Sequence, residues 1–154
     1  MLEHLKSHLK DKTIILGIGN TLRSDDGVGS LLAARIKEKT PFIVWDAAMS
    51  AENYLEKIIK ENPATVVIID AADFGGKPGE FRELEAGDLQ TVNLFSTHNA
   101  SLSLLINYLQ GHIKADIIIL IIQPKTTKFG DILSPQVQAA LDELETWFLK
   151  QSHA

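Results

Sequence analysis

Cysteine is absent from the 154 residues, and no apolar run is long. Without thiols the chain forms no disulfide, thiolate nucleophile or cysteine-based metal site, so a bound metal must be held by Asp, Glu or His. The apolar runs at 65–69 and 117–122 are far shorter than the roughly 20 residues of a membrane helix. Residues 1–12 lack the apolar stretch of a signal peptide, which predicts a cytoplasmic protein without membrane insertion.

Positive charge is sparse. The chain has 15 Lys and Arg against 20 Asp and Glu, a net charge of -5, and the basic residues are scattered along the sequence. This distribution argues against nucleic acid as a partner, because no basic stripe is available to follow a phosphate backbone. The length and the 45% hydrophobic content predict one globular domain that spans residues 1–154.

Short runs rich in β-branched residues predict four buried strands, at 13–18, 42–45, 65–69 and 117–122. Such continuous apolar strands are typical of a parallel sheet covered on both faces. Apolar residues at helical spacing predict helices within 28–36, 54–59, 102–109 and 137–148, with Gly111 ending the third. Residues 1–12 are expected to form an additional N-terminal helix.

A glycine-rich turn at 75–79 precedes the alternating segment 80–84, which predicts a half-exposed antiparallel edge strand. The elements together predict an α/β fold, a three-layer α/β/α sandwich. Its sheet is expected to be twisted and mostly parallel, with about five strands and one antiparallel edge strand.

Ligands of open α/β sheets bind outside the carboxyl ends of the strands, so the residues after each strand are the candidates. Gly17 and Gly19 follow the first strand, but Leu22 stands where a dinucleotide-binding fingerprint requires glycine. The glycines instead indicate a tight turn and a close backbone approach. An eight-residue span then carries the chain to Asp25 and Asp26, where the next helix is expected to start.

Each candidate ligand has a structural alternative. Asp25 and Asp26 suit a helix N-terminus, where Asp is a favoured cap, and Asp70 can bind the backbone of its own loop. His98 can cap or pack at the start of its helix, where the helix dipole also keeps imidazole neutral and able to bind a metal. If two carboxylates and one imidazole converge, they form an open site for a divalent transition metal. The histidines His4 and His8 are interpreted as part of a solvated helix face.

The chain carries five short motifs in a fixed order: Gly-Ile-Gly-Asn at 17–20, Ser-Asp-Asp-Gly-Val-Gly at 24–29, Ile-Asp-Ala at 69–71, Pro-Gly-Glu at 78–80 and Ser-Thr-His-Asn at 96–99. In these motifs the sequence resembles the hydrogenase maturation endopeptidases, most closely the branch that processes hydrogenase-3-type enzymes. The resemblance extends from about residue 13 to residue 148.

The resemblance implies that Asp26, Asp70 and His98 bind metal and carry catalysis. Some relatives have Glu at the first of these positions, so Asp26 has a shorter reach. Gly19 and Asn20 match the turn that shapes the substrate cleft. Asp25 and Thr97 are expected to contact the substrate as well.

The resemblance also implies the reaction, which is cleavage of one peptide bond near the C-terminus of a nickel-iron hydrogenase large-subunit precursor after nickel insertion. Nickel held by the precursor is expected to serve as the recognition element, and zinc or cadmium also suits such a site. We expect a monomer.

Two alternatives remain open. The glycine turn is compatible with a non-catalytic module that binds a nucleotide or another small ligand. A family member that has lost activity and only chaperones the precursor is less consistent with the sequence, because all three ligand positions hold competent ligands.

Overall fold

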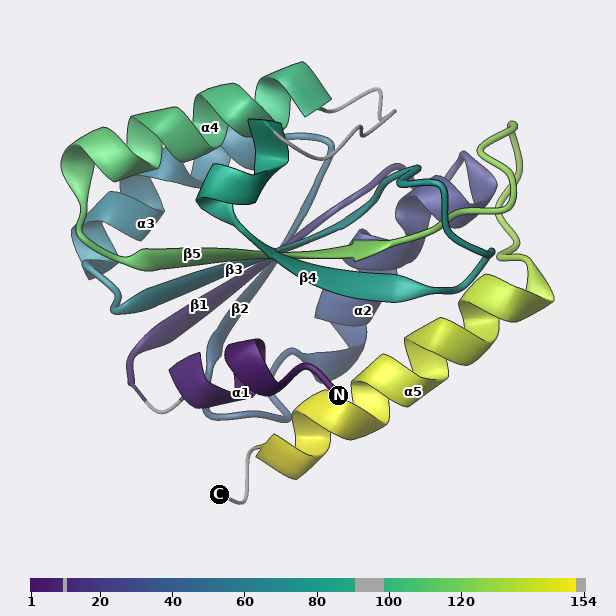
Figure 1. Cartoon of the computed structure of the whole chain (residues 1–154), viewed down its shortest axis with the longest axis horizontal. Helices are drawn as coiled ribbons and strands as arrows, with labels where there is room; N and C mark the ends of the chain where they lie inside the picture. Colours follow the sequence, from purple (N-terminus) through teal and green to yellow (C-terminus); the bar gives the residue numbers. More distant parts are fainter. Residues whose placement is uncertain (10, 91–98, 152–154) are drawn as a thin grey trace.

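The computed structural model describes residues 1–9, 11–90 and 99–151. Within these ranges the elements follow in the order α1 (Glu3–His8), β1 (Thr13–Ile18), η1 (Ser24–Gly27), α2 (Val28–Ile36), β2 (Ile43–Ala48), η2 (Ala51–Tyr54), α3 (Leu55–Glu61), β3 (Thr65–Ala71), β4 (Phe81–Glu85), η3 (Ala86–Gln90), α4 (Asn99–His112), β5 (Asp116–Ile122) and α5 (Pro135–Gln151). The strands lie in one layer between the helices (Figure 1).

The five strands form one sheet in the order β2-β1-β3-β5-β4. All neighbouring pairs are parallel except β4 and β5, whose antiparallel register places Phe81 opposite Ile122. Every residue of β1 and β3 is buried, as expected for central strands covered on both faces. The predicted mostly parallel sheet with one antiparallel edge strand is therefore confirmed.

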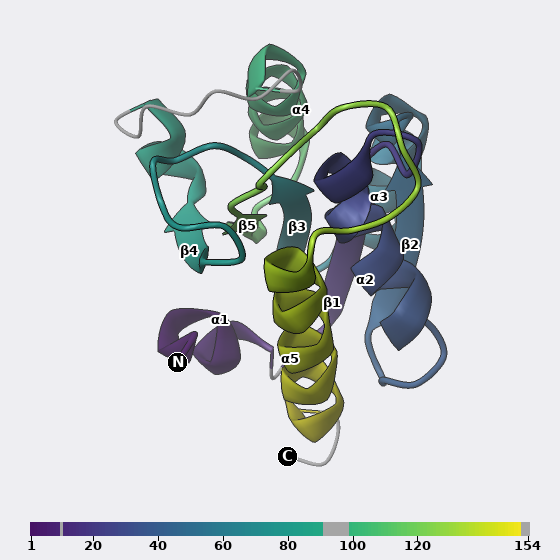
Figure 2. The same ribbon diagram turned by 90° about the vertical axis from the view of Figure 1, so that its right-hand side faces the viewer.

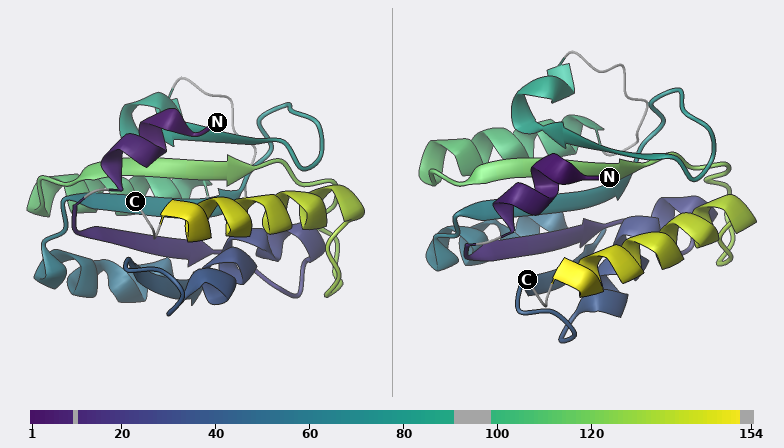
Figure 3. Two further views of the ribbon diagram at one scale, coloured as in Figure 1. Left: turned by 90° about the horizontal axis from the view of Figure 1, so that it is seen from below. Right: turned by 60° about the horizontal axis from the view of Figure 1, so that its bottom comes forward.

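Helices cover both faces of the sheet, which confirms the three-layer architecture (Figures 1 and 3). On one face, α1, α2 and α5 pack against alternate strand residues such as Ile15, Val67 and Leu120. On the other face, α3 and α4 pack against the intervening residues, including Leu16 and Ile68. The period of two along each strand thus divides the apolar residues between two cores.

Two predicted element boundaries are wrong. Gly111 does not end its helix, because α4 continues through His112. The helix expected to start at Asp25 or Asp26 starts at Val28 instead, and a separate 3-10 turn, η1, precedes it. None of the helices within the described ranges is long and apolar enough to cross a membrane.

The N-terminal helix α1 docks onto the sheet edge. Leu5 is fully buried, and the Glu83 carboxylate of β4 accepts hydrogen bonds from the backbone N–H groups of His4 (3.1 Å) and Leu5 (2.7 Å). His4 and His8, predicted to lie on a solvated helix face, keep 39% and 25% of their side chains exposed, but each also contacts an acidic residue of the sheet. Nε2 of His4 lies 2.6 Å from Oε1 of Glu85, and Nε2 of His8 lies 3.3 Å from Oδ2 of Asp116.

Candidate active site at the carboxyl ends of the strands

The site is built where the chain direction across the sheet reverses, between β1 and β3. From β1 the chain passes to β2 on one side and then returns to β3 on the other. Helix α2, which follows β1, packs on the same face of the sheet as α5, whereas α3, which precedes β3, packs on the opposite face together with α4 (Figure 2). In open α/β sheets, ligands bind in a crevice outside the carboxyl ends of the strands at such a switch point, and Gly19 and Asp70 lie at those ends.

Glycines bring η1 and α2 against these strand ends. A Cβ atom at Gly29 would overlap the carbonyl oxygens of both Ile18 and Ile69, and one at Gly19 would overlap the carbonyl oxygen of Asp26. Only glycine permits these approaches. The close backbone approach predicted from the glycine turn is confirmed at Gly19, and it places the η1 turn in contact with β3.

Asp26 lies in η1 with 6% of its surface exposed. Its Oδ2 accepts a hydrogen bond from the backbone N–H of Asn20 at 3.2 Å, so the turn after β1 orients this carboxylate. The side chain of Asn20 stabilises the same turn, because its Oδ1 accepts from the N–H of Leu22 at 2.9 Å. Gly19 and Asn20 therefore shape the crevice beside Asp26, and their contact with substrate stays a prediction.

Asp70 is the penultimate residue of β3 and is 1% exposed. Its Oδ1 accepts a hydrogen bond from the N–H of Ala71 at 2.9 Å. The local backbone interaction considered for this residue is thus present. Metal binding by Asp70 stays a prediction.

Asp25 is fully buried and binds the segment between β5 and α5. Its carboxylate accepts from the N–H groups of Lys125 (2.8 Å), Thr126 (3.2 Å) and Ser134 (2.7 Å), and from the hydroxyl of Ser134 (2.8 Å). These bonds hold a distant loop beside η1 and do not cap α2, so the capping interpretation is wrong for Asp25. Its expected substrate contact stays a prediction.

The same loop is fixed to η1 through Ser24, whose φ of 52° lies in the left-handed region. The N–H of Ser24 donates to the Gly130 carbonyl at 2.7 Å, and its hydroxyl donates to the Lys128 carbonyl at 2.8 Å. The turn that carries Asp26 is therefore held by the β5–α5 loop as well as by the strand ends.

His98 and Thr97 lie outside the described residues, so their expected roles stay predictions. Helix α4 begins at Asn99, directly after His98 in the chain. Across the described ranges, no group of three or more His, Asp and Glu side chains is arranged to hold a metal ion. Asp26 in η1 and Asp70 in β3 lie on separate elements at the carboxyl ends of neighbouring strands, which we call the rim, and their binding of a metal together with His98 stays a prediction.

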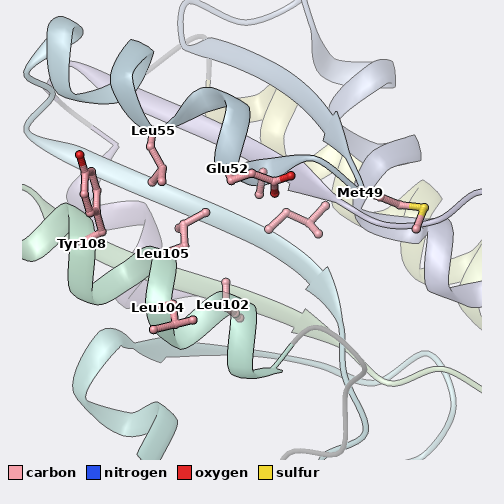
Figure 4. Close-up of a pocket in the computed structure, with 9 residues that line it drawn as sticks. Met49, Glu52, Leu55, Leu102, Leu104, Leu105 and Tyr108 are labelled. Carbon is pink, nitrogen blue, oxygen red and sulfur yellow. The ribbon is translucent and has the colours of Figure 1, made fainter.

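Next to this rim lies a groove of about 510 Å³ between α3 and α4 (Figure 4). The sequence does not predict it, because helical spacing indicates which residues face the core and not whether two helices leave a gap. Apolar side chains dominate its lining, among them Met49, Leu55, Leu102, Leu104, Leu105 and Tyr108.

The fold and the rim define a small α/β protein with acidic side chains at the carboxyl ends of its parallel strands. The family model described as "Hydrogenase maturation protease" matches residues 27–151. The "Hydrogenase 3 maturation protease" of Escherichia coli (strain K12) is 34% identical over 135 residues, which are 86% of this chain and 84% of that protein.

Solved structures of hydrogenase maturation proteases have the same fold as this chain. The structure of the NiFe hydrogenase maturation protease HycI from Thermococcus kodakarensis has a TM-score of 0.86 at 29% identity, covering 99% of this chain and 100% of that one. The endopeptidase HycI from Escherichia coli has a TM-score of 0.80 at 30% identity, covering 90% of each chain. The chain belongs to the hydrogenase maturation protease family. This membership favours a peptidase over a nucleotide-binding module.

Proposed function

We propose that this protein removes the C-terminal extension from a nickel-iron hydrogenase large-subunit precursor after nickel insertion. The family supplies the class of reaction. The observation that carries the proposal is that Asp26 and Asp70 each lie at the carboxyl end of one of two neighbouring strands. Asp26 is bonded to the turn after β1, and Asp70 is the penultimate residue of β3. Carboxylates at such strand ends are placed to bind a ligand that enters from outside.

In this proposal nickel belongs to the substrate and acts as the recognition element. The carboxylates of Asp26 and Asp70, together with His98, complete the coordination of nickel already held by the precursor, which brings the scissile bond to the crevice. The metal then either polarises the scissile carbonyl or lowers the pKa of an attacking water. Zinc or cadmium fits the same ligand set.

The protein acts as a cytoplasmic monomer in this proposal. Light scattering tests the monomer, because a monomer has the chain mass of 17.0 kDa.

A processing assay tests the function. Purified protein is incubated with the precursor, with and without nickel, and the mass of the large subunit is measured. Asp26→Asn and His98→Ala proteins are each expected to lose about 100-fold in rate, because each loses a metal ligand and even the partners of such ligands are worth about 10- to 100-fold. Asn is chosen at position 26 because it keeps the side-chain volume. Asp142→Asn, on the exposed surface of α5, is the control that retains full activity.

Circular dichroism establishes that each variant is folded. Undiminished processing by folded Asp26→Asn or His98→Ala protein contradicts the proposed site, and absence of cleavage by the wild-type protein with every candidate precursor contradicts the proposed function.

A further inference from the structure

The groove between α3 and α4 exposes apolar surface that no other part of the described ranges covers. Leu104 is 70% exposed, Met49 59% and Tyr108 40%, and all three line a hollow of about 510 Å³. A concave apolar surface of this size is characteristic of a binding site, whereas single exposed apolar residues are ordinary. The groove is therefore a candidate for a site beyond the metal-binding rim.

The groove and the rim share the same loops. Ile18 lines the groove and directly precedes Gly19, and the N–H of Gly19 donates to the carbonyl of Ala48 at 2.9 Å, next to Met49. Figure 4 shows Met49 and Tyr108 at opposite ends of the groove, with the leucines between them. One end thus opens beside the crevice where Asp26 and Asp70 lie, and the other points away along α3 and α4.

We propose that this groove binds the C-terminal extension of the precursor, the segment that is cut off. This inference rests on the proposed function, in which the scissile bond lies at the rim and the chain on one side of it must cross the adjacent surface. A hollow of about 510 Å³ has room for a few apolar side chains of one segment. A stable interface between two folded bodies is much larger and buries roughly 800 Å² on each partner. A flexible tail suits it, and the folded part of the precursor does not.

The charged groups at the groove define the tail further. Glu52 lines the groove and is exposed, and the Tyr108 hydroxyl at the far end donates to Oε1 of Glu56 at 3.0 Å. Carboxylates along an apolar groove favour a basic residue in the occupant. The preferred tail therefore combines apolar side chains, which contact the leucines, with a Lys or Arg that faces Glu52.

The experiment measures KM and kcat on nickel-loaded precursor, and the binding of a fluorescein-labelled synthetic peptide of its C-terminal extension by fluorescence polarisation. Leu104→Gln is expected to raise KM and the peptide Kd roughly tenfold, because burial of one leucine is worth at least that factor. Its kcat stays near the wild-type value, since the reacting atoms are at the rim.

Two controls and one further test variant, Glu52→Gln, accompany Leu104→Gln. Leu104→Met keeps an apolar side chain of similar volume and retains wild-type KM. Ile132→Gln replaces a residue that is 78% exposed outside the groove, and it also retains wild-type KM. Glu52→Gln raises KM by roughly threefold at low salt and less at high salt, as expected for an exposed charge pair.

The outcomes separate this inference from the proposed function. If wild-type protein cleaves the precursor while Leu104→Gln shows unchanged KM and peptide binding, the groove assignment is overturned and the function stands. A dimeric wild-type protein that Leu104→Gln makes monomeric identifies a second copy as the occupant and also overturns it. If wild-type protein cleaves no precursor, both proposals fail.

Discussion

At the scale of single residues, Asp25 is the carboxylate with the most described hydrogen bonds to other segments. Asp25→Ala removes four accepted bonds and leaves the N–H of Ser134 unpaired in a buried position. We expect the free energy of unfolding to fall by about 3 kcal/mol, measured by urea denaturation. Asp131→Ala, an exposed Asp in the same loop, should change it by less than about 0.5 kcal/mol. A loss of similar size in both variants contradicts the anchoring role.

Asp73 gives a residue-scale prediction about pH. The hydrogen bond from the N–H of Gly75, followed by that from the Gln123 side chain, holds the pKa of Asp73 below the ordinary 3.8. A carboxyl with a lowered folded pKa stabilises the fold above its unfolded pKa, and this contribution is lost as the pH falls through the folded pKa. The effect is small because Asp73 is close to solvent. An NMR titration that places its pKa at or above 3.8 contradicts this.

Single residues differ in how far the sequence predicts them. Asp70 ends an apolar run and Asp26 lies in the turn region after another. Because the carboxyl ends of parallel strands lie at one edge of a sheet, the sequence predicts that both residues lie at that edge. The partners of Asp25 are not predictable, because the segment at 125–134 lies 100 or more positions away and has no pattern that indicates contact. For Asp70 the sequence leaves a local backbone bond and metal binding as alternatives, and the structure shows the local bond to Ala71.

At the scale of elements, the packing of α2 on the sheet depends on Gly29. Gly29→Ala is expected to destabilise the protein by about 2 kcal/mol, because the added Cβ would overlap the carbonyl oxygens of Ile18 and Ile69. Gly111→Ala is the matched control, because it makes the same substitution at a position without crowding. It lies in the last turn of α4 with open space around its Cβ position, and it should stabilise the protein by about 0.5 kcal/mol. Thermal denaturation of both variants measures these changes in stability. A higher Tm for Gly29→Ala than for the wild type would contradict the close packing of α2 on β1 and β3.

The elements themselves were largely predictable from periodicity. Apolar runs on central strands and helical spacing on the covering helices are local signals, and β1, β3 and β5 follow them. Features set by tertiary contacts were not predictable. The docking of α1 depends on Glu83, a residue of the distant β4, and the groove depends on the separation of α3 and α4.

At the scale of the whole molecule, the rim predicts that nickel binding is divided between enzyme and substrate. The expected ligand set of two Asp and one His is small and rich in carboxylate, so the isolated protein should bind Ni²⁺ weakly by isothermal titration calorimetry. The nickel-loaded precursor should bind more tightly than the nickel-free precursor, because its metal gains ligands on docking.

A double comparison tests this division. Asp26→Asn and Asp70→Asn keep the side-chain volume but replace a carboxylate by a weaker neutral ligand, so each should reduce the difference in Kd between the two precursor forms. Asp142→Asn, on the surface of α5, should preserve it. Tight nickel binding by the free protein, or an unchanged difference in the two rim variants, means that the protein recognises its substrate without sharing the metal.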